Sequence, residues 1–364
     1  MKRFTTYGSP AFERRLAAEL RAMASDFARA LSGELRSLVL VGGYGRGEGA
    51  VEKRGSHEYP YNDLDLVLIL SRFRRSWPSR LEAVRRSWQD RLGLHIDLSR
   101  PLTERGVRNW PHRLLWHDVV QGHRVLWGQP DLIESSAPTR LYSPPPRIEA
   151  SLLLLNRGAG LIEAVRQRLS AAEPDPKDPD FIRRNAFKVD LAMMDAVLLA
   201  HGVYLPSLVS RPARLAALSR TEPEVARLDL LEVAERAVRF KHLPSSLSPE
   251  VSTESLGRRL ERFGEVLCHV ESARTGEPRP SLRTVIEDRR IREGVEHRLT
   301  RLPINLWRQL QRGRIHWRSP REDLIPRLAT LLESSPIRQE PESGRVSDWC
   351  RDSEGFYRLW ARLT

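Results

Sequence analysis

The sequence predicts an α/β domain built on a mixed sheet, followed by an all-α helical domain. In the first third of the chain, short aliphatic runs alternate with amphipathic helical patterns. A proline-rich stretch at 135–147 comes next and is typical of a linker. Beyond it, apolar residues recur at three- and four-residue steps, which favours helices. We therefore expect one domain over residues 1–137 and a helical domain over residues 147–364.

The composition indicates a soluble protein of the cytoplasm. Hydrophobic residues make up 40% of the chain and charged residues 29%, which suits globular domains with buried cores. The first residues lack the apolar core of a signal peptide, and the longest aliphatic runs are too short to cross a membrane. Cys268 and Cys350 are too few for a disulfide framework, so we expect a reducing compartment and no membrane partner.

The net charge of +13 is compatible with a nucleotide or RNA partner. However, only five of the 60 basic residues are lysine, and the arginines are spread along the chain among aspartates and glutamates. This distribution favours solvated helix faces over a nucleic-acid-binding tail. An RNA-binding module therefore stays an alternative rather than the main hypothesis.

The N-terminal domain is expected to follow a regular order of helices and strands. The aliphatic run at 63–70 is typical of a strand covered on both faces, so it should be central in its sheet. The polar, turn-rich stretch at 52–61 predicts a loop. The remaining patterns predict helices over 10–31, 77–92 and 111–121, and strands over 35–41, 94–98 and 124–127.

The second domain is expected to be entirely helical. Its first two helices, 148–169 and 181–200, lie within the stretch 148–205 that we expect to bind nucleotide or acceptor. Further helices are predicted over 222–240, 252–274, 281–301, 321–333 and 352–363.

The stretch from Leu38 to Asp65 contains most of the candidate functional residues. A strand-like run ends in Gly42-Gly43-Tyr44-Gly45-Arg46-Gly47-Glu48, where backbone N–H groups can approach a ligand closely. The next apolar run opens with Asp63 and Asp65, which project from one face of a strand because side chains alternate with a period of two. Two like charges held this close are unfavourable unless a cation lies between them. The pattern therefore predicts a divalent metal site beside a phosphate-binding loop.

Asp97 is the best candidate for a third carboxylate. It lies in a short apolar run, and its neighbours Ile96 and Leu98 should point to the opposite face. A carboxylate in a turn at the end of a strand is the structural alternative. Three carboxylates would suit Mg²⁺, which prefers oxygen ligands, or Mn²⁺, which accepts them.

The ordered set of Gly42-Gly43, Asp63-Leu64-Asp65 and Asp97 resembles the signature of the DNA polymerase β-type nucleotidyltransferases. The run from Gly42 to Glu48 is similar to the opening of the catalytic domain of PII-uridylyltransferases, although no regulatory domains of that kind follow it. The resemblance covers roughly residues 35–130. It implies a polymerase β-like core in which Asp63, Asp65 and Asp97 are catalytic and bind the metal ions.

The resemblance also implies how the nucleotide is held. Gly42 and Gly43 would contact its phosphates through backbone N–H groups at a helix N-terminus. Independently of the resemblance, the guanidinium of Arg46 in the glycine loop suits phosphate recognition, and a salt bridge to Glu48 is the alternative. Lys188 is notable because lysine is scarce here, and similar two-domain enzymes often place a basic residue near the triphosphate; a surface pair with an aspartate is its alternative.

The function that these residues predict is metal-dependent transfer of a nucleoside monophosphate from an NTP to an acceptor hydroxyl, with release of pyrophosphate. The acceptor stays open among a small molecule, a protein side chain, an RNA end and a second nucleotide, because all would use the same carboxylates. A nucleotide-sensing or antitoxin-like regulatory protein with little turnover is the other alternative.

Overall fold

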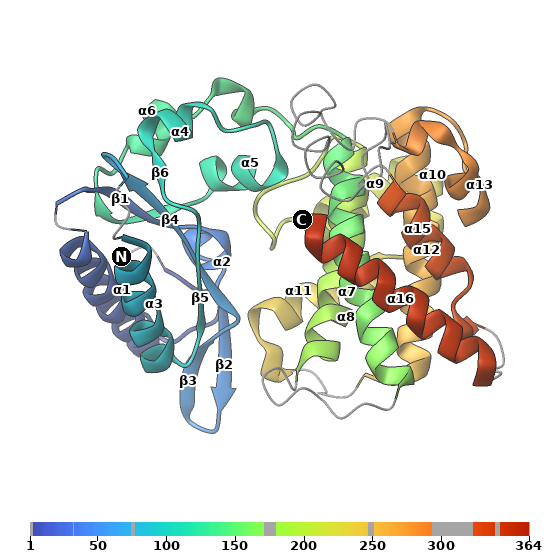
Figure 1. Ribbon diagram of the computed structural model, residues 1–364, viewed down its shortest axis with the longest axis horizontal. Coiled ribbons are helices and arrows are strands. Elements are labelled where there is room, and N and C mark those ends of the chain that lie inside the picture. Colours follow the sequence, from blue (N-terminus) through green and yellow to red (C-terminus); the bar gives the residue numbers. More distant parts are fainter. Residues whose placement is uncertain are drawn as a thin grey trace, which may run out of the picture. The chain divides into compact units, whose positions relative to one another are not determined.

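The computed structural model describes residues 3–31, 33–73, 77–170, 180–246, 251–292, 323–338 and 343–363. It confirms a mixed α/β region followed by a largely helical one (Figure 1). The chain forms two compact units. The first consists of Met1–Pro146, Leu205–Arg211 and Val238–Ser248, and the second of Arg147–Tyr204, Pro212–Ala237 and Pro249–Thr364. Two short segments from the helical half of the sequence thus belong to the first unit.

The first unit is built on a mixed sheet with the strand order β5-β4-β1-β7, in which β6 also pairs with β4. The strand β4 pairs antiparallel with β1 and parallel with β5, so its expected central place is confirmed. The bounds are β1 Leu35–Leu40, β4 Asp63–Leu70, β5 His95–Leu98, β6 Leu102–Thr103 and β7 Arg124–Gly128.

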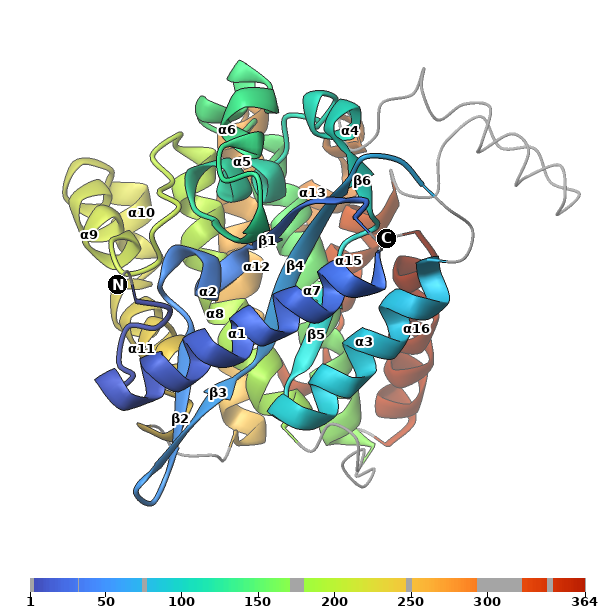
Figure 2. The ribbon, with the colours of Figure 1, turned by 90° about the vertical axis from the view of Figure 1, so that its left-hand side faces the viewer.

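Alternate residues of β4 enter two separate hydrophobic cores. Leu64, Leu66 and Leu68 pack on one face of the sheet against α1 (Pro10–Ala30) and α3 (Trp77–Leu92). These two helices lie side by side across that face (Figure 2). Val67 and Ile69 pack on the other face with the short helices α4 (Glu104–Arg108), α5 (Leu114–Gln121) and α6 (Leu132–Ser136). This double burial fixes the register of β4, because a slip by one residue would exchange its two faces.

The stretch 52–61, expected as a loop, is instead a β-hairpin of β2 (Ala50–Arg54) and β3 (His57–Tyr61). Polar residues concealed the strands, because most of this ribbon is exposed and only its first residues, including Val51, reach the core. Gly55, with φ +59°, makes the tight connection possible. The Tyr44 hydroxyl donates to the Ala50 carbonyl at 2.8 Å and accepts from the Tyr61 N–H at 3.0 Å, which anchors the hairpin.

The proline-rich stretch 135–147 contains the end of α6 and the 3₁₀-helix η1 (Thr139–Tyr142), whose Leu141 is fully buried in the first unit, and the first segment of that unit ends within the stretch at Pro146. One further expectation needs correction. The helix expected over 222–240 is broken into α10 (Pro223–Arg227) and α11 (Leu231–His242). Asp229 lies between them with φ +47°, which is incompatible with a continuous helix.

The described part of the second unit contains helices and no strands. Among the residues that the structure describes in either unit, no helix is long and apolar enough to cross a membrane. The expected helix 281–301 ends much earlier, and the part of it beyond Arg292 lies outside the described residues, as do the first two residues of the helix expected over 321–333. The remaining helices are α7 (Ile148–Leu169), α8 (Phe181–Ala200), α9 (Arg211–Thr221), α12 (Thr253–Thr275), α13 (Leu282–Glu287), α15 (Leu324–Glu333) and α16 (Ser343–Leu363).

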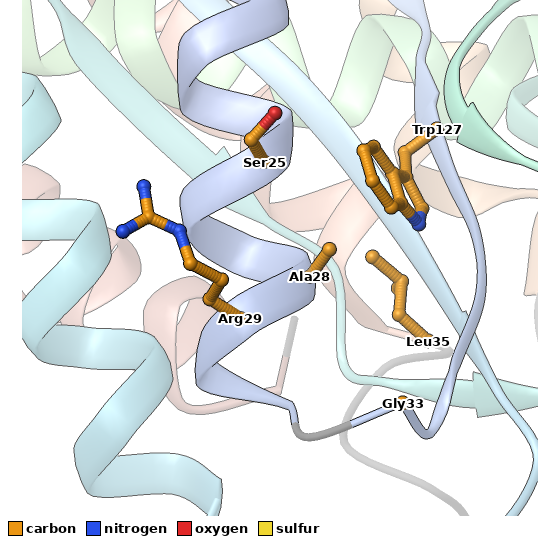
Figure 3. A pocket seen from close by; sticks show the side chains of 6 residues that line it. All are labelled: Ser25, Ala28, Arg29, Gly33, Leu35 and Trp127. Atoms are coloured by element: carbon orange, nitrogen blue, oxygen red, sulfur yellow. The ribbon is translucent and has the colours of Figure 1, made fainter.

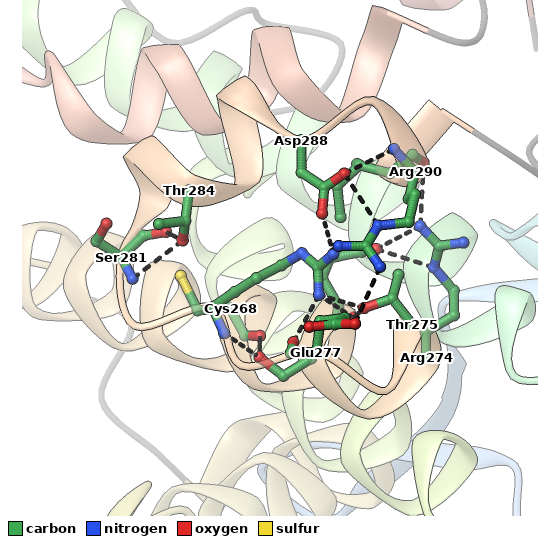
Figure 4. Close-up of polar contacts among 12 residues, drawn as sticks. Cys268, Arg274, Thr275, Glu277, Ser281, Thr284, Asp288 and Arg290 are labelled. Carbon is green, nitrogen blue, oxygen red and sulfur yellow. Dashed lines mark hydrogen bonds and ion pairs between the residues drawn. The ribbon is translucent and has the colours of Figure 1, made fainter.

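Arginine side chains, one of them buried, hold the end of α12 against the segment that follows it (Figure 4). Arg279 is 5% exposed, forms an ion pair with Asp288, and donates to the Glu277 carbonyl at 2.6 Å. Arg290 forms an ion pair with the Glu277 side chain at 3.1 Å. Because a buried guanidinium needs nearly all of its donors satisfied, this network fixes the path of the chain into η3 (Arg289–Arg292).

A histidine pair joins α8 to α12 in the second unit. The Nε2 atoms of His201 and His269 lie 3.0 Å apart, and the ring centroids are 5.2 Å apart. With the two Nε2 atoms this close, the centroids can be this far apart only if each ring points its Nε2 atom at the other ring. One Nε2–H therefore donates to the other Nε2. Burial lowers the pKa of both imidazoles; the positive charge of Arg147 lowers the pKa of His201 further, and Glu222 and Glu224 oppose these effects.

The histidine pair should make the second unit sensitive to acid. The folded state holds both imidazoles neutral, whereas the unfolded state takes up protons below a pH of about 6.5, so stability should fall as the pH decreases from about 7 toward 5. Urea unfolding followed across this range should show that decline. The double variant His201→Gln, His269→Gln should have a flatter profile, and an equally steep one would contradict this assignment.

Candidate active site

The paired register of β4 and β5 brings the three predicted aspartates to one face of the sheet. Asp65 lies directly opposite Asp97, and Asp63 lies two residues before Asp65 on the same strand. Leu64 and Ile96 are fully buried in the core on the α1 side, so the aspartates project from the other face. On that face they lie beyond the apolar cover that begins at Val67. The three carboxylates therefore share one open corner of the sheet.

The charge at this corner is only partly balanced. Burial of Asp65, together with the negative charges of Asp63 and Asp97, raises its pKa to about 6. The positive charges of Lys241 and Arg46 act in the opposite direction without cancelling the effect. A carboxyl group this hard to ionise is an expected feature of a site that awaits a cation.

The glycine loop lies directly beside Asp65. The Val41 N–H donates to the Asp65 carbonyl at 2.9 Å, and the short helix α2 (Gly42–Arg46) begins at the next residue. Gly42 has φ +64°, and a Cβ atom there would lie 2.2 Å from Asp65 Oδ2. The backbone conformation therefore favours glycine at position 42, and the Asp65 carboxylate occupies the space that a Cβ atom would fill. Gly43 follows it, so both predicted loop glycines adjoin the carboxylate corner.

Glu48, at the end of the glycine loop, connects the loop to the segment Leu205–Arg211. Its carboxylate accepts hydrogen bonds from Ser207 Oγ at 2.7 Å and from the Leu208 N–H at 3.1 Å, and pairs with Arg46 at 3.3 Å. Burial would raise the pKa of Glu48, but these hydrogen bonds and the charge of Arg46 lower it below its ordinary value. The salt bridge between Arg46 and Glu48, which was the alternative to phosphate binding, is thus present. Phosphate binding by Arg46 stays a prediction.

Lys241 and His242 were missed from the sequence. Both come from the segment Val238–Ser248, which belongs to the first unit although it begins 110 residues after the end of β7. The positive charge of Lys241 acts on Asp65, and His242 is buried beside Glu48 and Arg46. The scarcity of lysine in the chain was a possible signal for Lys241. The predicted Lys188 belongs to α8 of the second unit.

The carboxylate corner needs side-chain rotation to hold an ion. In the parts of the chain that the structure describes, no three histidine, cysteine, aspartate or glutamate side chains are already gathered as ligands of one metal. The Asp65 carboxylate is turned toward Gly42, and mutual repulsion favours separation of the three groups. The backbone register nevertheless gives a set of oxygen donors that suits Mg²⁺ or Mn²⁺.

A shallow hollow of about 470 Å³ lies elsewhere on the first unit (Figure 3). It is lined by residues of α1, β1 and β7 and of the turn after α1, and the indole of Trp127 faces Leu35 across it. These side chains are mostly small or apolar, whereas the carboxylates lie on β4 and β5. We therefore place the chemistry at the carboxylate corner, on the basis of its charges. The lining residues are Ser25, Ala28, Arg29, Gly33, Leu35 and Trp127.

In the comparisons made, no protein-family description and no curated sequence matches the chain. The site is therefore judged from its own geometry: three carboxylates on adjacent strands, a glycine loop against one of them, and a lysine whose charge reaches the same group.

Replacing Asp65 by asparagine should stabilise the metal-free protein at neutral pH. Because folding raises the pKa of Asp65 to about 6, wild-type stability should fall as the pH rises from about 4 to about 7. Asp65→Asn mimics the protonated group, so its free energy of unfolding at pH 7.5 should exceed that of the wild type by about 1–3 kcal/mol. Urea unfolding at both ends of this range provides the measurement.

The difference between Asp65→Asn and the wild type should nearly vanish at pH 4. The exposed Asp131, at the start of α6, serves as a matched control, because its side chain makes no capping hydrogen bond. Asp131→Asn should leave the pH profile unchanged. A gain for Asp65→Asn that is as large at pH 4 as at pH 7.5 would show that charge is not its cause.

Proposed function

We propose that the protein is a metal-dependent nucleotidyltransferase, which transfers a nucleoside monophosphate from an NTP to an acceptor hydroxyl. The observation that carries the proposal is the register that sets Asp65 opposite Asp97, with Asp63 on the same face, beside the glycine loop. Phosphoryl-type transfer needs mainly positioning and charge stabilisation, and this corner offers groups for both.

The chain's own residues take distinct parts in the proposed reaction. Asp63, Asp65 and Asp97 would hold the divalent metal, and Asp97, on the edge strand β5, would also orient the acceptor hydroxyl. The loop that begins with Gly42 and Gly43 lets the triphosphate approach the backbone, and Lys241 supplies positive charge. A bound divalent cation supplies the charge that stabilises the attacking and leaving oxygens.

The bond changes are those of a single displacement at phosphorus. The acceptor oxygen forms a bond to the α-phosphorus while the bond between that phosphorus and the β-bridging oxygen breaks. Pyrophosphate leaves, and the hydroxyl proton passes to a carboxylate of the site or to solvent. No oxidant, reductant or further cofactor is needed.

Labelled nucleotides test this proposal. The wild-type protein is incubated with Mg²⁺ or Mn²⁺, each of the four α-³²P-labelled NTPs and a cell extract, and label in a product other than free nucleotide is measured together with pyrophosphate. Asp63→Asn, Asp65→Asn and Asp97→Asn should each lower transfer at least about 100-fold, the scale of removing one electrostatic contact to a transition state.

The control and the nature of the product complete this experiment. Asp131→Asn should label as well as the wild type. Protease or ribonuclease treatment of the labelled product separates a protein or RNA acceptor from a small molecule. If the three β-strand variants label as well as the wild type, the proposal is wrong; NTP binding without any pyrophosphate would favour a nucleotide-sensing protein instead.

A further inference from the structure

A histidine lies in the same corner as the carboxylates. His95 pairs with Asp63 across β4 and β5, just as Asp97 pairs with Asp65. In β5 the fully buried Ile96 separates the exposed His95 from the exposed Asp97, so these two side chains share the outward face. The open corner of the sheet therefore presents an imidazole as well as three carboxylates.

The spacing allows the imidazole and the carboxylates to reach one point. Paired residues on neighbouring strands lie about 4.8 Å apart, and residues two apart on one strand lie about 6.6 Å apart. The four side chains thus rise from the corners of a small rectangle on one side of the sheet. Since His95 is exposed, its ring can turn toward Asp63 without disturbing a packed core.

We propose that His95 is a nitrogen ligand of the metal site and that it gives the site a preference for a first-row transition-metal ion over Mg²⁺. This inference rests on the proposed function, because it assumes that Asp63 binds the ion. Mg²⁺ favours oxygen donors, whereas imidazole favours transition metals. A site of three carboxylates and one imidazole should therefore bind Mn²⁺ or a later metal of the row more tightly than a site of carboxylates alone.

Pulsed electron paramagnetic resonance with Mn²⁺ as the probe tests the assignment. In the full-length protein without a histidine tag, bound Mn²⁺ should show the ¹⁴N coupling of a directly coordinated imidazole. His95→Gln should abolish this coupling and weaken Mn²⁺ binding at least about 10-fold, a loss seen even when a residue that only supports a metal ligand is removed. Its Mg²⁺ affinity, measured by competition against Mn²⁺, should change less than about twofold.

Two further variants sharpen the result. His95→Asp should keep Mn²⁺ bound, lose the ¹⁴N coupling and shift the preference toward Mg²⁺, because it replaces a nitrogen donor by an oxygen donor. The control His57→Gln alters an exposed histidine on β3, outside the corner, and should behave as the wild type. Circular dichroism and thermal unfolding of each variant establish that it is folded.

The possible failures are distinguishable. Suppose that Asp63→Asn abolishes Mn²⁺ binding. If the wild type then shows no ¹⁴N coupling, or if His95→Gln still shows the ¹⁴N coupling, His95 is not a ligand and the proposed function stands. If Asp63→Asn binds Mn²⁺ as tightly as the wild type does, both the metal site and this inference are wrong.

Discussion

Repulsion among the carboxylates of β4 and β5 is the constraint on which the rest of the first unit depends. Asp63, Asp65 and Asp97 would separate if their strands were free to slip, yet Leu64, Leu66 and Ile96 lock those strands into the core. The buried apolar faces thus offset the cost of holding like charges together. Burial of Asp65, together with the negative charges of Asp63 and Asp97, raises the pKa of this carboxyl group, so part of that cost is not cancelled within the protein.

The glycine loop is shaped by two demands on its opposite sides. On the side of the sheet, Gly42 leaves room for the Asp65 carboxylate, and a Cβ atom on Gly45 would meet the Leu40 carbonyl at 2.4 Å. On the other side, Glu48 binds Ser207 and the Leu208 backbone. Contacts within the chain therefore hold the loop closely against β4.

The sequence was sufficient where local periodicity decides structure. A period of two placed Asp63 and Asp65 on one face, and the apolar neighbours of Asp97 indicated its direction. It was insufficient where contacts are distant or the element is exposed. The hairpin of β2 and β3 has too few buried residues to show a strand pattern, and the break at Asp229 depends on one unusual φ value. Lys241 joins the first unit only through tertiary folding, which no local pattern reports.

The excess of arginine supports the fold more directly than it supports nucleic-acid binding. Arg259 pairs with the fully buried Asp190 at 2.9 Å, Arg274 pairs with the fully buried Glu271 at 2.6 Å, and Arg166 pairs with Glu163 at 2.7 Å. Guanidinium groups used in this way are not available to phosphates of RNA.

The carboxylate corner is different, since asparagine at position 65 would fit the same space without the electrostatic cost. A protein that bound nucleotide or RNA without a metal ion would gain stability from that change, so an aspartate at this position favours the proposed cation site over those alternatives.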